Sequence, residues 1–411
     1  RPEGNVPNLR FPEFQEEWEK CKVSDLLDFY STNSLSWDKL EYGTDAIQNL
    51  HYGLIHVGLP TMIDLSKDKL PNITNGNTPK NYELCQEGDI AFADASEDTN
   101  EVAKAVEFYK LNGKDVICGL HTIHGRDNQQ KTVVGYKGYA FSSTAFHHQI
   151  RRIAQGTKIY SINSKNFSEC YIGIPSKEEQ KKIATLLRLI DERISTQNKI
   201  IEDLKKLKSA ISKLLFTRKD LLETTIRLAD IATLKNGYAF QSSKYNILGK
   251  WKIITIANVS GGRYINEEDC NCIINLPNDI QDHQVLKEGD ILISLTGNVG
   301  RVSLCKSGAY LLNQRVGLLQ IEGNIDKEFL YQVLSSRRFE NNMVACGQGA
   351  AQMNIGKGDV ENFVLPYSSN ANNIHLVARI LHSYDECIIN ELRELTLLTM
   401  QKQYFLVQMF I

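Results

Sequence analysis

Two long stretches of the chain carry apolar residues at alternating steps of four and three. The first covers residues 176–216 without an internal proline or glycine, and Ser176 followed by Glu179 is a capping box that predicts where the helix begins. A four-three repeat is typical of a coiled-coil seam, whereas a helix on a globular domain has a broader apolar face. Because such a helix cannot bury its seam alone, we expect a partner helix.

The second stretch lies near the end of the chain and repeats the first at a constant offset of 194 residues. Polar residues interrupt both seams at the same places: Gln197 corresponds to Glu391. Likewise, Lys208 corresponds to Lys402. If the helices pack antiparallel about a pseudo-two-fold axis, Gln197 faces Lys402. The same symmetry places Lys208 opposite Glu391, and such polar pairs commonly fix the register of a coiled coil. The residues predicted to pair the helices are Ile183, Leu187, Ile190, Ile194, Gln197, Ile201, Leu204, Lys208, Ile211, Val377, Leu381, Tyr384, Ile388, Glu391, Leu395, Leu398, Lys402 and Phe405.

The remaining parts of the chain show short β-branched and aromatic runs separated by turn residues, which predicts domains of mixed strands and short helices. These parts are repeats of one another. KVSDLLDF at 22–29 aligns with RLADIATL at 227–234, and EGDIAFADAS at 87–96 aligns with EGDILISLTG at 288–297. A repeat of this length indicates an internal duplication with two-fold pseudosymmetry, because solenoid repeats are far shorter.

We therefore predict an α+β fold in which two pseudo-symmetric mixed α/β domains are separated by two long helices that form an antiparallel intramolecular coiled coil. The predicted boundaries are a lead-in at 1–20, a first domain at 21–174, a first helix at 175–220, a second domain at 221–366 and a second helix at 367–411.

Composition narrows the classes of function. No apolar run approaches the roughly 20 residues that cross a bilayer, and no signal-peptide pattern opens the sequence, so we expect a cytoplasmic location. A formal net charge of −2 means that any nucleic-acid binding uses local patches or partner proteins. The nine cysteines are scattered without a C-x-x-C pair and are expected to be reduced and packed inside, the alternative being a zinc ion at Cys270 and Cys272.

Several motifs resemble the specificity subunit of type I restriction-modification systems. They are RFPEF at 10–14, KNGYAFQSSKY at 235–245, TGNVGR at 296–301, LNQRVG at 312–317 and the junction IPSKEEQKKIATLLRLIDERI at 174–194. The second junction, LPYSSNANNIHLVARILHSYDECI, lacks the acidic pair and glutamine after its proline, which puts the start of the second helix in doubt.

This resemblance implies two target-recognition domains that read the halves of an asymmetric, split DNA target. It implies double-stranded DNA and two modification (methyltransferase) subunits as partners, together with two restriction (translocase/nuclease) subunits in complexes that also cleave DNA. S-adenosylmethionine, ATP and Mg are expected on the partner subunits, with no cofactor or metal on this chain. Neither the N/D-P-P-Y/F loop of a DNA methyltransferase nor the G-x-x-x-x-G-K-S/T loop of a translocase is present, so we expect no catalysis by this chain.

Loops in both domains carry donors suited to base edges and phosphates. Taken singly, each of these residues is equally consistent with a solvated surface position. His121 and His124 also suit a metal pair, and Tyr238 with Phe240 also suits a packed aromatic core. The predicted DNA-binding residues are Lys80, His121, His124, Arg126, Arg151, Arg152 and Lys158 in the first domain, and Lys235, Asn236, Tyr238, Lys244, Asn298, Arg301, Asn313, Gln314 and Arg315 in the second.

Two other classes of function remain open on sequence grounds. One is a coiled-coil scaffold or regulatory protein that does not recognise DNA. The other is a self-sufficient DNA-modifying enzyme with an unrecognised site. The scaffold hypothesis does not explain why a globular domain would be present in two diverged copies, whereas reading two different half-sites would require that divergence.

Overall fold

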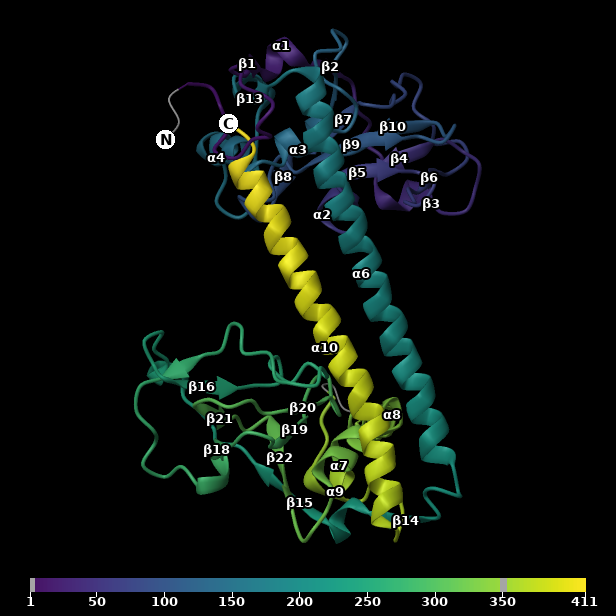
Figure 1. The fold of residues 1–411 in the computed structure, drawn as a ribbon, viewed down its shortest axis with the longest axis vertical. Coiled ribbons are helices and arrows are strands. Elements are labelled where there is room, and N and C mark those ends of the chain that lie inside the picture. The colour runs from purple at the N-terminus through teal and green to yellow at the C-terminus, as the bar shows by residue number, and fades with distance from the viewer. Residues whose placement is uncertain (1–3, 348–352) are drawn as a thin grey trace. The chain divides into compact units, whose positions relative to one another are not determined.

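The computed structural model describes residues 4–347 and 353–411, which form two compact units (Figure 1). One unit comprises Arg1–Asn198 and Glu394–Ile411, and the other comprises Lys199–Arg393. Each unit holds one mixed domain and part of each long helix, α6 (Lys177–Thr217) and α10 (Ala371–Gln408).

The first domain is built from short strands with helices inserted between them. Its elements are β1 (Glu19–Lys22), α1 (Val23–Leu26), β2 (Asp28–Tyr30), η1 (Trp37–Lys39), β3 (Leu40–Glu41), β4 (Gln48–Leu50), α2 (Tyr52–His56), β5 (Met62–Asp64), β6 (Asn72–Ile73), β7 (Ile90–Ala93), β8 (Ala95–Ser96), β9 (Ala105–Lys110), β10 (Val116–Cys118), β11 (Thr122–Arg126), α3 (Tyr136–Phe141), α4 (Thr144–Ile153), β12 (Tyr160–Ser161), α5 (Ser164–Ser168) and β13 (Tyr171–Ile174).

The second domain has a comparable series. Its elements are β14 (Thr224–Arg227), η2 (Leu228–Asp230), β15 (Ala232–Asn236), η3 (Ser242–Lys244), β16 (Trp251–Ile254), β17 (Cys272–Ile273), η4 (Asp282–Gln284), β18 (Val285–Leu286), β19 (Ile291–Ser294), β20 (Val302–Leu304), β21 (Tyr310–Leu312), β22 (Val316–Ile321), α7 (Lys327–Leu334), α8 (Arg337–Cys346), α9 (Lys357–Glu361) and β23 (Val364–Tyr367).

Four strands of one sheet follow the same order in the two domains. The order β2-β11-β7-β9 in the first domain corresponds to β15-β22-β19-β20 in the second, and β5 extends the first-domain sheet beyond β9. Each domain also has a sheet with one parallel pair, β4 with β10 and β16 with β21. An antiparallel pair joins the entry and exit of each domain, β1 with β13 and β14 with β23. The predicted internal duplication and mixed fold are therefore confirmed.

Equivalent helix starts repeat as well. The hydroxyl of Ser143 accepts from the backbone N–H of Phe146 at the start of α4, and the hydroxyl of Ser336 accepts from the N–H of Phe339 at the start of α8. Both serines satisfy an N–H that the first turn of a helix leaves without an intrahelical partner. The Ser-Ser dipeptide is thus a local signal for the start of a helix, and both domains retain it.

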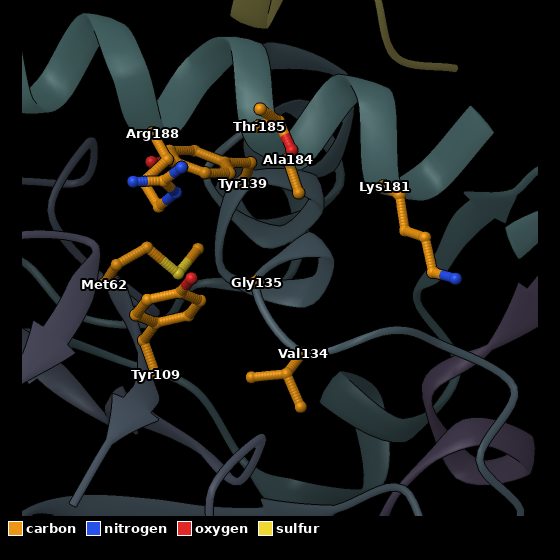
Figure 2. A pocket seen from close by; sticks show the side chains of 9 residues that line it. All are labelled: Met62, Tyr109, Val134, Gly135, Tyr139, Lys181, Ala184, Thr185 and Arg188. Carbon is orange, nitrogen blue, oxygen red and sulfur yellow. The ribbon is translucent and has the colours of Figure 1, made fainter. Parts of the chain in front are cut away.

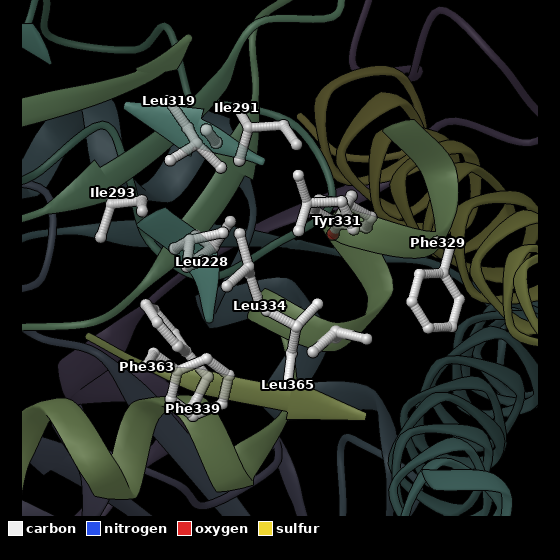
Figure 3. Packing of buried hydrophobic residues seen from close by; sticks show 14 of the residues in the cluster. Leu228, Ile291, Ile293, Leu319, Phe329, Tyr331, Leu334, Phe339, Phe363 and Leu365 are labelled. Carbon is white, nitrogen blue, oxygen red and sulfur yellow. The ribbon is translucent and has the colours of Figure 1, made fainter. Parts of the chain in front are cut away.

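Each long helix packs on a domain at its ends. In the second unit, Leu215 and Phe216 of α6 share one buried cluster with Val377 and Leu381 of α10. The centre of that cluster holds residues from β19, β22, α7 and β23, and Figure 3 shows their side chains interlocked, with the Phe339 and Phe363 rings edge to face at 4.9 Å. Burying one such side chain contributes roughly 1.5–3 kcal/mol. The ends of both long helices therefore belong to the hydrophobic core of the domain on which they pack. For this reason the boundary between the two units falls within α6 and within α10.

The long helices run antiparallel within each unit. In the first unit Lys402 lies 2.7 Å from Asp191, and Arg193 lies 3.3 Å from Glu394, so positions advance along one helix as they retreat along the other. All residues predicted to pair the helices are buried or half-buried.

Each seam lysine forms an ion pair with an aspartate that the sequence pattern did not identify. Lys208 contacts Asp385 at 2.6 Å, and Lys402 contacts Asp191. Each aspartate lies six residues before the predicted partner (391 − 385 and 197 − 191). The physical reason is that these aspartates also accept hydrogen bonds from the domains, so the lysines pair where helix and domain meet. The two ion pairs are still related by the 194-residue offset.

Candidate nucleic-acid interface

One turn occupies the same place in both domains. It joins β10 to β11 in the first domain and β21 to β22 in the second. The backbone N–H of Asp94 donates to the carbonyl of His121 at 3.1 Å. In the second domain the N–H of Leu295 donates to the carbonyl of Arg315 at 3.0 Å. Because Asp94 and Leu295 each follow the equivalent central strands β7 and β19, His121 and Arg315 occupy equivalent positions. Both side chains are exposed.

In the second domain this turn is tied to the end of β15. The N–H of Tyr238 donates to the carbonyl of Leu312 at 2.8 Å, and the N–H of Gln314 donates to the carbonyl of Tyr238 at 2.9 Å. The side chains of Asn236, Gln314 and Arg315 are exposed around this junction. Hydrogen-bond donors from two loops that are distant in sequence therefore lie around one junction.

The Tyr238 side chain is held at the edge of this surface. Its hydroxyl donates to Asp279 at 2.8 Å, and this hydrogen bond to the carboxylate raises the pKa of Tyr238. Its ring lies 4.9 Å from that of Phe240, which packs on the buried cluster around Ile253. Both rings are half-buried, and Phe240 contacts the hydrophobic cluster whereas the Tyr238 hydroxyl is hydrogen-bonded to Asp279.

Gly237 is required where the two loops meet, which gives a test of the junction. A Cβ at this position would lie 2.1 Å from the backbone oxygen of Asn313. We expect Gly237→Ala to displace the 312–315 turn and to lower the stability of the second domain by about 1–3 kcal/mol, because the clash is with backbone. Gly262→Ala is the matched control, since its Cβ would meet no atom nearer than 3.7 Å. Hydrogen exchange should be faster at 312–315 in the first variant alone, and equal exchange in both variants would contradict the prediction.

The other predicted residues of the second domain are spread over its surface. Asn298 is exposed in the turn between β19 and β20, and Lys244 is exposed in η3. Arg301 is half-buried, lies 3.8 Å from Glu340 and lines a cavity of about 240 Å³. Lys235 is half-buried within β15. The structure therefore does not gather these four at the turn that holds Arg315. Asn313, the remaining predicted residue, is half-buried within the turn itself.

In the first domain the predicted surface is centred on His121. Its backbone has a φ of 54°, which is uncommon outside glycine and marks a constrained turn. Its Nδ1 lies 3.1 Å from Asp94 Oδ1, and its ring meets that of Tyr52 edge to face at 5.2 Å. The side chain is thus fixed in direction while remaining exposed.

The basic end of α4 lies near the loop that follows β7. Arg151 donates to Asn100 at 3.1 Å, and β8 pairs with β12, which places the loop at 94–100 beside the end of the segment 154–161. Arg152 and Lys158 are exposed in or near that segment. Thr296 forms the equivalent bridge to Asn354 in the second domain. Lys80 is exposed on a separate loop before β7.

The burial of two predicted DNA-binding residues contradicts their assignment. His124 is 0% exposed and Arg126 is 9% exposed. His124 Nε2 lies 2.7 Å from Asp89 Oδ2, and Arg126 donates to both oxygens of the same carboxylate at 2.9 and 2.8 Å. Burial alone would raise the pKa of Asp89, but the hydrogen bonds from His124 and Arg126 outweigh it and lower the pKa. Both residues are therefore internal supports of β11, and His121 and His124 make separate contacts.

Comparison with known proteins identifies the family. A family model described as the type I restriction modification DNA specificity domain matches residues 69–206 and, a second time, residues 223–399. The chain belongs to this family.

Named relatives agree with the assignment of the specificity family. The type I restriction enzyme MjaVIII specificity subunit of Methanocaldococcus jannaschii is 29% identical over 310 residues, which cover 64% of this chain and 72% of the relative. A putative MjaX specificity subunit from the same organism is 24% identical over 384 residues, 89% of this chain and 86% of the relative. The solved structure of a type I restriction-modification S subunit from M. genitalium has a TM-score of 0.57 at 18% identity and covers 99% of both chains, which shows a shared fold.

A second apolar stripe runs along each long helix of this specificity-family chain, and sequence reasoning missed it. On α6 the exposed residues Ile200, Leu207 and Leu214 recur every seven positions. On α10 the exposed residues are Leu397, Met400, Tyr404 and Val407, at steps of three and four. The sequence does contain a signal for this stripe, because its apolar residues occupy a second heptad position next to the seam position. Exposed apolar residues at heptad spacing are typical of helices that pack against another helix.

The contact of α6 with the first domain encloses only a small cavity. Figure 2 shows Ala184, Thr185 and Arg188 of α6 facing Met62 and Tyr109 of the domain. The cavity measures about 80 Å³, below the roughly 300–1,000 Å³ of an ordinary small-molecule site. It is a packing gap where the specificity domain meets its helix.

Within the described ranges, no helix combines the length and the apolar character needed to span a bilayer.

Proposed function

We propose that this chain is the DNA-recognition subunit of a type I restriction-modification complex, in which each domain reads one half of an asymmetric split target. The observation that carries the proposal is the equivalence of the His121 and Arg315 turns. One fold presents the same turn twice with different exposed side chains. Two equivalent turns with different donors are what reading two different half-sites requires.

The chemistry of the two turns fits base recognition. Arginine matches guanine through two parallel hydrogen bonds in the major groove, and asparagine or glutamine matches adenine in the same manner. The second domain offers Asn236, Gln314 and Arg315 on one surface. The first domain offers His121, with Arg151, Arg152 and Lys158 suited to phosphates.

The apolar stripes on the long helices support partner binding. We propose that the stripe Ile200, Leu207, Leu214 and the stripe on α10 each dock helices of a modification subunit, giving two such subunits per chain. These subunits would bind S-adenosylmethionine and methylate a flipped adenine, while restriction subunits would use ATP and Mg to translocate and cleave DNA. This chain would perform no chemistry itself. Because its role requires chromosomal DNA, we place it in the cytoplasm.

Long-read detection of N6-methyladenine tests the proposal. DNA from cells that express this chain with its cognate modification subunit is compared with DNA from cells that lack only this chain. We expect a split, asymmetric methylated motif that depends on the chain. If the modification subunit is active with another specificity chain but this chain adds no motif, the protein is a scaffold.

A further inference from the structure

Three potential metal ligands converge inside the first domain. Cys85 precedes β7, Cys118 ends β10 and His124 lies in β11, and one ligand atom from each lies within 4.8 Å of the others. The two sulfur atoms are 3.6 Å apart. Two thiolates bound to one zinc ion at about 2.3 Å and a tetrahedral angle are separated by about 3.8 Å, so the cysteines already have the spacing that zinc requires.

A buried ring nitrogen at this cluster has no partner. His124 is fully buried, and its Nε2 is engaged by Asp89, but its Nδ1 makes no hydrogen bond. Leaving a buried polar atom unsatisfied costs about 1–3 kcal/mol, and such atoms in folded proteins are commonly explained by a bound ion or water. The neutral imidazole would use that lone pair to bind a metal.

The surroundings fit a divalent ion with two thiolates. Two thiolates and one neutral imidazole cancel the charge of Zn²⁺, and the neighbouring Asp89 and Arg126 cancel one another. A carboxylate on the far nitrogen of a metal-binding histidine orients the ring and strengthens its donor character.

We propose that Cys85, Cys118 and His124 bind a structural zinc ion that cross-links the two sheets of the first domain. Cys118 belongs to the sheet β10-β4-β6-β3, His124 belongs to the sheet β2-β11-β7-β9-β5, and Cys85 lies in the segment between them. These three residues fill three of the four positions around a tetrahedral zinc ion. Cys85 also lines a surface groove of about 580 Å³ with Glu83 and Asp115. The turn that carries His121 lies between Cys118 and His124 in the sequence. A zinc ion bound to both residues would therefore fix the two strand ends from which this turn projects.

Metal analysis of the purified full-length chain tests the site. We expect one zinc per chain in the wild type and none in the Cys85→Ser/Cys118→Ser variant. Cys270→Ser/Cys272→Ser is the matched control, because both of its cysteines are half-buried and Cys270 and Cys272 are absent from the group of ligands found among the described residues. The control should retain the zinc. Zinc that persists in the first variant, or is lost only in the control, overturns the proposal.

Cobalt substitution tests the same site in the wild-type chain, so the result does not depend on whether the cysteine variant folds. Wild-type chain stripped of zinc and loaded with Co²⁺ should show a thiolate-to-cobalt charge-transfer band and the intense visible absorption of a tetrahedral site. His124→Ala should weaken both. Absence of these bands, or a Cys85–Cys118 disulfide found by mass spectrometry of the protein as isolated, contradicts the zinc site.

Discussion

Asp385→Ala is expected to lower the free energy of unfolding of the second unit by about 3–5 kcal/mol, the range for breaking a buried ion pair on one side. The side chain of Asp385 is 8% exposed. Its Oδ1 lies 2.6 Å from Lys208, and its Oδ2 accepts from Arg263 at 3.0 Å and from Gln332 at 2.6 Å. Alanine would leave two cations facing one another with little water. Glu328 would continue to neutralise Arg263, which keeps the expected loss within that range.

Asp191→Ala is the matched comparison, because Asp191 is the equivalent residue of the first repeat. It accepts from Tyr139 at 2.8 Å and pairs with Lys402, both within the first unit. The Asp191 side chain is 18% exposed against 8% for Asp385, and Arg263, the second cation on Asp385, is only 7% exposed. Water therefore reaches the ion pair of Asp191 more easily than that of Asp385. We therefore expect a smaller loss of about 1–3 kcal/mol.

Urea unfolding followed by hydrogen exchange measures both losses. Because a chain with two units need not unfold in one step, exchange should be read separately for each unit. Asp385→Ala should speed exchange in 199–393, and Asp191→Ala should speed it in the first unit. Equal losses for the two variants would contradict the view that burial of the counter-charges sets the cost.

Arg315→Ala is expected to relax base preference at one position in one half of the target, by a factor of about 5–150. This range corresponds to about 1–3 kcal/mol for one bidentate contact between arginine and guanine. His121→Ala should change the other half only, because His121 holds the equivalent turn in the other domain. Both side chains are exposed, so we expect neither change to disturb folding.

The methylated motif of each variant, obtained by long-read sequencing, gives the result directly. Lys244→Ala is the control, since Lys244 is an exposed cation of the same domain outside the turn. It should weaken binding evenly across sequences and reduce its salt dependence. A change in both halves from Arg315→Ala alone would contradict the assignment of one half to each domain.

Much of the architecture is determined by local patterns in the sequence. The four-three spacing along 176–216 and its repeat after 194 residues predict both long helices, because apolar spacing follows helical geometry directly. The same holds for the duplication, since the EGD motifs at 87–89 and 288–290 precede the equivalent strands β7 and β19. The sequence also suggests His121 and Arg315 as DNA-binding residues, and that assignment stays a prediction.

The tertiary structure alone decided which polar residues face inward. His124 and Arg126 are near His121 in sequence, yet their contacts with Asp89 bury them. Lys208 forms an ion pair with Asp385, whose carboxylate is also held in place by hydrogen bonds from residues of the domain. Cys85 and Cys118 are 33 residues apart and meet through strand pairing. The apolar spacing of a helix can be read from a few neighbouring residues. Which polar side chains are buried, and which distant residues meet, depends instead on the pairing of strands far apart in the sequence, and no local pattern specifies that pairing.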